Sequence, residues 1–233
     1  MIARKFVSAA AFVLATFGAS AVARADELQN QVLAVARAAR SDTHSFRRNL
    51  TIERTGAARK VFSEQYDPRR PAAQQWTLVS VDGRAPTAQE IEQSRKAKRG
   101  PVPSYGQLAD WFGAPASRSE HGPGYVLYRF ARLPAGALKI GSHDASPDTQ
   151  AEALVNTKGT QPFVEQIRFV SNKGFSMMLV ASIKSMAITG RYRMLPDGLV
   201  VPADSSSDMA GSLLGKSGQM RTSATYSDFQ KVR

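Results

Sequence analysis

"QPFVEQIRFVSNKGFSMMLVASIKSMAI", residues 161–188, indicates the fold class. It contains two strand-like runs rich in β-branched and aromatic residues, and Asn172 and Gly174 stand between them as turn formers. The pattern predicts a large antiparallel sheet, strongly curved or half closed into a barrel. Similar runs, separated by Gly, Pro, Asn and Asp, occupy residues 125–133, 152–156, 191–195, 198–202, 208–214 and 218–229.

Three further strands are predicted earlier in the chain, each from alternating apolar residues. Phe46, Leu50 and Ile52 share one face of the first run, and Phe62 and Tyr66 share one face of the second. The runs are "SFRRNLTIER" (45–54), "RKVFSEQY" (59–66) and "QQWTLVSV" (74–81).

Three helices accompany these strands. Apolar residues at helical spacing, from Leu28 to Ala39, predict the first one. A capping box at residues 87–90 begins the second, which we expect to end at Gly100-Pro101. The fold class is therefore α+β, mainly β: a curved antiparallel sheet forming an unclosed half-barrel with a helical lid. A short third helix, residues 104–113, places four large side chains largely on one side: Tyr105, Leu108, Trp111 and Phe112.

The first 25 residues have the pattern of a secretory signal peptide. Arg4 and Lys5 precede an apolar stretch over residues 6–22, and Ala23-Arg24-Ala25 supplies the small residues of a cleavage site. A retained membrane anchor is the competing interpretation, but the apolar stretch is short for a bilayer span. We expect cleavage after Ala25, a single domain over residues 26–233, and a location in the periplasm.

The chain carries a net charge of +12 and has no cysteine. Disulfides, thiolate metal sites and cysteine nucleophiles are therefore excluded. A basic surface attracts anions. In the periplasm, lipid head groups, an anionic membrane surface or a membrane-protein partner fit this charge better than nucleic acid does, and solubility alone explains it equally well. "SRKAKRG" (94–100) places four of the charges at a helix C-terminus, either to interact with the helix dipole or as a docking patch.

Catalytic and metal-binding patterns are weak. His44, His121 and His143 have no metal-binding spacing, and the common serine-nucleophile signatures are missing. Glu152 and Glu165 lie on predicted strands, but nothing in the sequence pairs them as an acid and a base. We expect no catalytic residue, no metal and no cofactor, so a hydrolase is the weakest interpretation.

"AGSLLGKS", residues 210–217, fits the loose form of a phosphate-binding loop. Such a loop needs a strand before it and a helix after it. Here the residues after Ser217 alternate as a strand does, so we expect a hairpin turn at Gly215 and Gly218 and no nucleotide site.

All methionines beyond the signal fall between residues 177 and 220, on consecutive predicted strands. Methionine suits an adaptable apolar surface, although ordinary core filling explains it as well. If the sheet and the helices meet imperfectly, an apolar cavity remains between them. Its predicted lining and lid are Phe46, Leu50, Phe62, Trp76, Leu78, Met177 or Met178, Leu108, Trp111 and Phe112.

Arg48 shares the inward face with Phe46 and Leu50 if that strand is regular. A buried guanidinium needs a partner: a lid carbonyl, a carboxylate or an anionic ligand head group. A bulge that turns Arg48 outward is the alternative, so Arg48 is only a candidate polar latch.

The layout as a whole resembles the LolA/LolB-like family of periplasmic lipoprotein carriers. The local likeness is in "ARLPAG" (131–136), residues 161–186, "GLVVP" (198–202) and "YSDF" (226–229). The resemblance implies an unclosed barrel whose helical lid covers an apolar cavity for the acyl chains of lipoproteins. Only three strands precede the helices here, fewer than in the carriers, so binding of a lipid, an acyl chain or an acylated protein is the expectation. A sensor or interaction domain that binds a protein partner is the alternative.

Overall fold

The computed structural model describes residues 25–39, 43–97, 102–171, 173–177, 181–213 and 215–232. Residues 1–24 of the predicted signal peptide, and Met178 of the predicted groove, lie outside these ranges. Within them, every helix is too short or too polar to cross a lipid bilayer.

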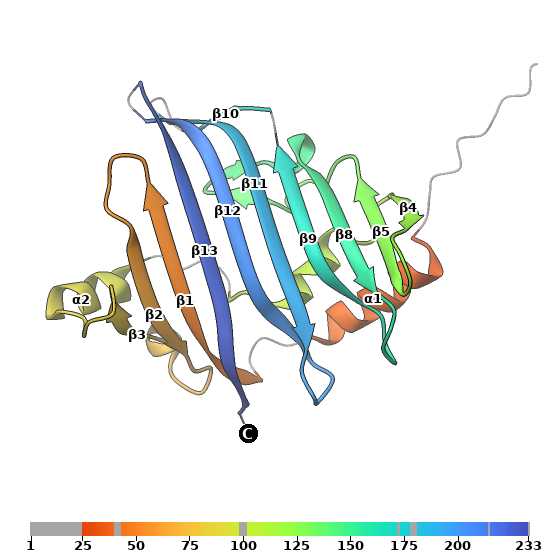
Figure 1. Ribbon diagram of the computed structural model, residues 1–233, viewed down its shortest axis with the longest axis horizontal. Helices are drawn as coiled ribbons and strands as arrows, with labels where there is room; N and C mark the ends of the chain where they lie inside the picture. The colour runs from red at the N-terminus through yellow and green to blue at the C-terminus, as the bar shows by residue number, and fades with distance from the viewer. Residues whose placement is uncertain are drawn as a thin grey trace, which may run out of the picture.

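Eleven strands form one antiparallel sheet, in the order β3-β2-β1-β13-β12-β11-β9-β8-β5-β4, with β10 paired to β11 (Figure 1). The first strand, β1, pairs with the last, β13, in the middle of the sheet. The sheet ends at β3 and β4 and does not close, which confirms the predicted curved, unclosed half-barrel. The strands are β1 His44–Arg54, β2 Lys60–Tyr66, β3 Trp76–Val81, β4 Ser117–Glu120, β5 Tyr125–Phe130, β8 Gln150–Asn156, β9 Phe163–Ser171, β10 Phe175–Met177, β11 Ala181–Met194, β12 Val200–Leu213 and β13 Lys216–Lys231; β6 Lys139–Ile140 and β7 His143–Asp144 form a separate pair.

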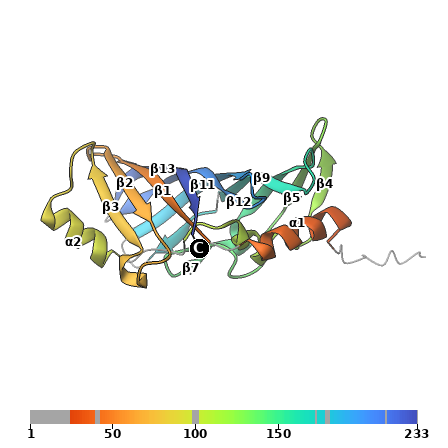
Figure 2. The same ribbon diagram turned by 90° about the horizontal axis from the view of Figure 1, so that it is seen from below.

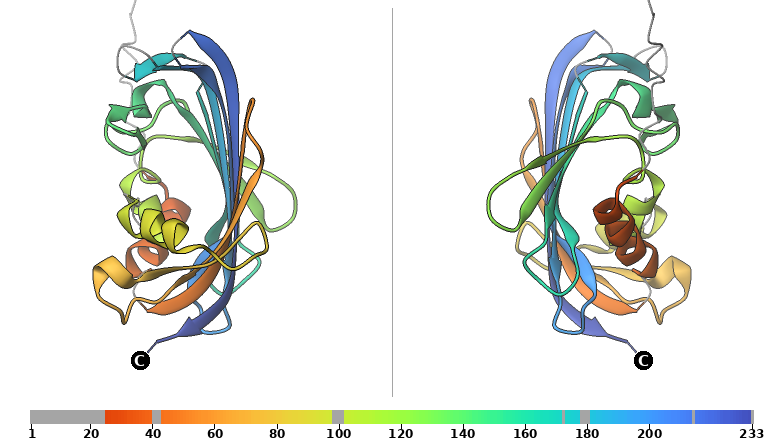
Figure 3. Two further views of the ribbon diagram at one scale, coloured as in Figure 1. Left: turned by 90° about the vertical axis from the view of Figure 1, so that its left-hand side faces the viewer. Right: turned by 90° about the vertical axis from the view of Figure 1, so that its right-hand side faces the viewer.

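The helices lie on the concave side of the sheet, and α1 and α2 stand near its opposite ends (Figures 2 and 3). The predicted capping box begins α2: the Glu90 backbone N–H donates to the Thr87 hydroxyl, and the Thr87 N–H donates to the Glu90 carboxylate. The third predicted helix is a 3-10 helix. The helical elements are α1 Glu27–Ala38, α2 Ala88–Lys96 and the 3-10 segments η1 Ala72–Gln74, η2 Tyr105–Asp110 and η3 Ser146–Asp148.

Two strand boundaries differ from the sequence expectation. Residues 176–188 are not one strand, because β10 runs antiparallel to β11, with Phe175 opposite Ile183. Conversely, β11 continues through Gly190, which the sequence suggests as a break. A Cβ on Gly190 would lie 3.2 Å from the Ile167 side chain, so glycine serves close packing between strands here and does not form a turn.

Residues 210–213 end β12 and residues 216–217 begin β13, and the two strands pair antiparallel, as the hairpin prediction requires. Gly215 takes a φ of +78°, which favours glycine. Gly218, expected in the turn, instead lies inside β13 opposite Gly211. A Cβ on Gly211 would meet the Ser182 carbonyl oxygen at 2.1 Å, so this position has no room for a side chain.

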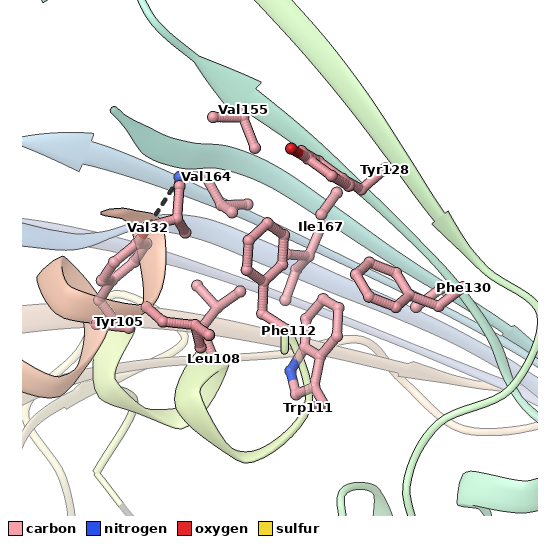
Figure 4. Packing of buried hydrophobic residues seen from close by; sticks show 14 of the residues in the cluster. Val32, Tyr105, Leu108, Trp111, Phe112, Tyr128, Phe130, Val155, Val164 and Ile167 are labelled. Atoms are coloured by element: carbon pink, nitrogen blue, oxygen red, sulfur yellow. Dashed lines mark hydrogen bonds between the residues drawn. The ribbon is translucent and has the colours of Figure 1, made fainter. Parts of the chain in front are cut away.

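The main core lies where α1 and η2 cover β5, β8 and β9. Aromatic side chains that follow η2 interlock with those of β5 (Figure 4). The ring centroid of Trp111 lies 5.2 Å from that of Phe130, and the centroid of Phe112 lies 5.4 Å from that of Tyr128. Edge-to-face contacts of this kind add to the hydrophobic gain of burial. Side chains therefore fill this half of the concave face.

Two hydrogen bonds fix the helical layer to the rest of the core. The Val164 backbone N–H of β9 donates to the Tyr105 hydroxyl at 2.8 Å. The buried Gln29 side chain of α1 donates to the Phe112 carbonyl at 2.9 Å. Both bonds join segments that are far apart in the sequence, so they hold α1, η2 and the sheet in one arrangement.

Phe112→Ala should lower the free energy of unfolding by about 3–5 kcal/mol, because the side chain is fully buried and leaves a cavity. Phe62→Ala should cost only about 1 kcal/mol, because Phe62 is half-buried on the same concave face. Urea unfolding of the two variants measures the difference. Equal losses would contradict the unequal covering of the two halves.

Candidate functional site

Half of the concave face carries apolar side chains that α1 and η2 do not cover. In the described part of the chain, no residue of β1, β2, β3 or β13 belongs to the core cluster beneath those two elements. We call this half the open face. Its half-buried apolar side chains are Leu50, Ile52, Phe62, Leu78, Met209 and Met220.

The strand register places these side chains on one surface, because directly opposite residues of neighbouring strands share a face. Leu50 lies opposite Phe62 on one side and Ala224 on the other. The register also runs from Ile52, on the same face as Leu50, across β13, β12 and β11 to Phe169 of the main core, which fixes this row on the concave side. Val79 of β3 lies at a register shift in the pairing with β2 and is 42% exposed.

Three methionines form a second row across the sheet. Met186 of β11 lies opposite Met209 of β12, which in turn lies opposite Met220 of β13. Met186 is buried, and the other two are half-exposed. Methionine is flexible and polarizable, so this row suits apolar partners of variable shape. The concentration of methionine late in the sequence indicated an apolar surface of this kind. The strand register that aligns the three methionines in one row was not predictable from the sequence.

An aromatic cluster closes one end of the open face. The Phe46 ring is at its centre, with its centroid 5.0 Å from that of Tyr66 and 5.6 Å from that of Trp76. Tyr226 and Phe229 of β13 complete the contacts around Phe46. Phe46, Trp76 and Leu50, which the sequence analysis grouped together, therefore do meet in the structure.

Arg48 points inward, and its partner is a carboxylate. Its Nε donates to Glu64 Oε2 at 2.9 Å, and its Nη2 contacts the same oxygen. The guanidinium also lies 4.2 Å from the centroid of the Trp76 ring, which is a cation–π contact. Glu64 is on the neighbouring strand β2, so this pair joins two strands and does not tether a helix.

A pocket of about 560 Å³ lies between α2 and the edge strand β3. Its volume is within the range of roughly 300–1,000 Å³ that is typical of small-molecule sites. Leu78 extends from it onto the open face, and no residue of α2 is buried. The pocket is lined by Arg70, Ala73, Gln74, Trp76, Thr77, Leu78, Ile91, Ser94 and Arg95. Ile91 and the arginines were absent from the predicted groove.

A second pocket, of about 580 Å³, lies at the methionine row. Ile183, Met209 and Met220 supply its apolar side chains, and Arg54 and Lys216 are also among its lining residues. The open face thus has a hollow at the edge beside α2 and another beside the methionine row.

The predicted lid residues lie elsewhere. Leu108, Trp111 and Phe112 are buried in the core cluster beneath α1 and η2, a different cluster from that of Phe46 and Trp76. A role for the three in ligand binding stays a prediction, while the structure assigns them to core packing. Met177 ends β10, and Met178 lies outside the described residues.

Within the residues that the structure describes, no group of three or more His, Cys, Asp or Glu side chains is placed to bind a metal ion. Glu152 pairs with Arg129, and Glu165 accepts a hydrogen bond from Asn156, so neither pairs with the other.

No family model and no curated protein matches the chain. A solved structure of similar fold is that of a LolA superfamily protein from Nitrosomonas europaea, the family that the sequence resembles. The two chains are 14% identical, with a TM-score of 0.37, and the match covers 90% of this chain and 94% of the other.

Glu64→Leu should lower the free energy of unfolding by about 3 kcal/mol, because it leaves the largely buried Arg48 charge without its carboxylate. The double variant Arg48→Met/Glu64→Leu should recover to within about 1 kcal/mol of the wild type, because an apolar pair of similar size needs no counter-charge. Chemical denaturation of both variants measures this. A double variant that is no more stable than Glu64→Leu would show that the ion pair is not the source of the loss.

Proposed function

We propose that this protein is a non-enzymatic binding protein, exported to the periplasm, that holds the acyl chain of a lipid or lipoprotein on the open face. The proposal is supported by the half-buried apolar side chains of the open face, on a curved sheet whose other half is filled by the main core. Exposed apolar surface of this kind in a folded protein indicates a binding site.

The energetics favour a chain-like apolar ligand. Each methylene that leaves water for the open face contributes about 0.8 kcal/mol. A straight acyl chain can follow the shallow rows of side chains from the pocket beside α2 toward the methionine row. Apart from the edge strand β3, the strands that carry these rows are paired on both sides, so little ordering of the protein is needed on binding.

In this proposal α2 is the movable cover. It packs against β3 without a single buried residue, whereas η2 buries Tyr105 and Leu108 in the main core. Moving α2 exposes little apolar area, so the cost of opening is small. Moving η2 would break the aromatic contacts of Trp111 and Phe112.

The test compares two neighbouring residues of β3, of which Leu78 lines the pocket beside α2 and Val79 does not. Leu78→Gln should weaken binding of a fluorescent fatty-acid probe by about tenfold, the equivalent of one lost apolar side-chain contact. Val79→Gln, at a 42% exposed position outside that pocket, is the matched control and should bind as the wild type does. Native mass spectrometry of the protein purified from the periplasm should show bound lipid in the wild type and the control.

Two results would contradict the proposal. One is equal probe binding by all three proteins. The other is an absence of both co-purified lipid and probe uptake in the wild type, which would favour the alternative of a protein partner on the same face.

A further inference from the structure

We propose that the pocket between α2 and β3 binds the phosphate-bearing head group of a phospholipid whose acyl chain lies on the open face. This inference rests on the proposed function and specifies the ligand's polar end. It starts from two arginines, Arg70 and Arg95, which line one pocket together with the apolar side chains of Trp76 and Leu78.

The two arginines come from different parts of the chain. Arg70 stands just before η1, and Arg95 is in the last turn of α2. A basic residue in the last turn of a helix interacts favourably with the helix dipole, which accounts for Arg95 alone. It does not account for Arg70 on the same pocket. A guanidinium binds phosphate oxygens through a planar fork of donors, so two of them suit one phosphate group.

The nearby carboxylates are already engaged. Glu90 is bound by Arg84, whose hydrogen bonds lower the Glu90 pKa to about 2. Glu92 pairs with Lys96 at 2.6 Å. Both acids of α2 therefore have other partners, and within the residues that the structure describes Arg95 forms no ion pair.

Arg70 is only partly neutralised. Its Nη1 donates to the Thr77 hydroxyl at 2.9 Å, and its Nε lies 3.8 Å from Asp67. Asp67 is held mainly by Arg69, whose two hydrogen bonds to the carboxylate lower the Asp67 pKa. One carboxylate thus serves two arginines. Among the residues that line the pocket in the described chain there is no acid, so its field is positive.

The rest of the lining suits the remainder of such a ligand. Gln74, Thr77 and Ser94 are the uncharged polar residues of the lining, which suits the glycerol backbone of such a ligand. Trp76, Leu78 and Ile91 are apolar, and Leu78 belongs to both the pocket and the open face. A head group between the arginines would therefore direct its acyl chain toward Phe62 and Leu50.

The experiment measures binding of two single-chain ligands with the same acyl chain, lysophosphatidylglycerol and the uncharged monoacylglycerol. The variant is Arg70→Gln/Arg95→Gln, in the full mature chain. The matched control is Arg37→Gln/Arg168→Gln, which removes two charges from exposed positions outside the pocket. Thermal unfolding checks that both variants fold. If the Arg70→Gln/Arg95→Gln variant does not fold, Arg70→Lys/Arg95→Lys is measured in its place, because it keeps the charge and removes the planar fork of donors.

Lysophosphatidylglycerol should bind the Arg70→Gln/Arg95→Gln variant about tenfold more weakly than the wild type, as expected for two lost, partly exposed ion pairs. Monoacylglycerol should bind all proteins within about twofold, and added salt should weaken only the anionic ligand. Three results would overturn the head-group site and leave acyl binding intact: equal loss of affinity for both ligands, no loss of affinity for either ligand, or the same loss of affinity in the control variant. If neither ligand binds the wild type, the proposed function itself is wrong.

Discussion

The structure depends on one constraint: a single curved sheet presents more apolar surface on its concave side than α1 and η2 cover. Burial of apolar area is the main favourable term in folding, so the covered half forms the core. The aromatic contacts of Trp111 and Phe112 with β5 set the position of that cover. Because they hold η2 over one half, the other half keeps Leu50, Phe62 and Met220 partly in water.

Chain order explains why the division falls where it does. Strand β1 pairs with β13, so the three early strands extend the long C-terminal meander as a flank of the same sheet. The segment from β3 to β4 then has to return to the far end. On the way it leaves α2 beside β3 and places η2 over β9. The topology thus places α2 beside β3 and leaves the open face without cover from α1 and η2. The pocket between α2 and β3 lies outside the main core.

Local signals were the predictable part of this fold. The Thr87–Glu90 capping box and the inward alternation of Phe46, Arg48 and Leu50 depend on neighbours in the sequence or on strand periodicity, and both are present in the structure. Which helix would fill the sheet was not predictable, because Trp111 and Phe130 are brought together only by the whole fold. The same holds for Arg70 and Arg95, whose common pocket forms only when α2 docks beside β3.

If ligand binds on the open face and not beneath η2, the methionine methyl groups report on both places. Met209 and Met220 lie on the open face, while Met194 packs against the filled core. This is measured by a methyl NMR titration of residues 26–233 with a single-chain phospholipid. We expect the Met209 and Met220 signals to shift on binding while the Met194 signal stays unchanged. A shift of Met194 with no change at Met209 and Met220 would contradict this expectation.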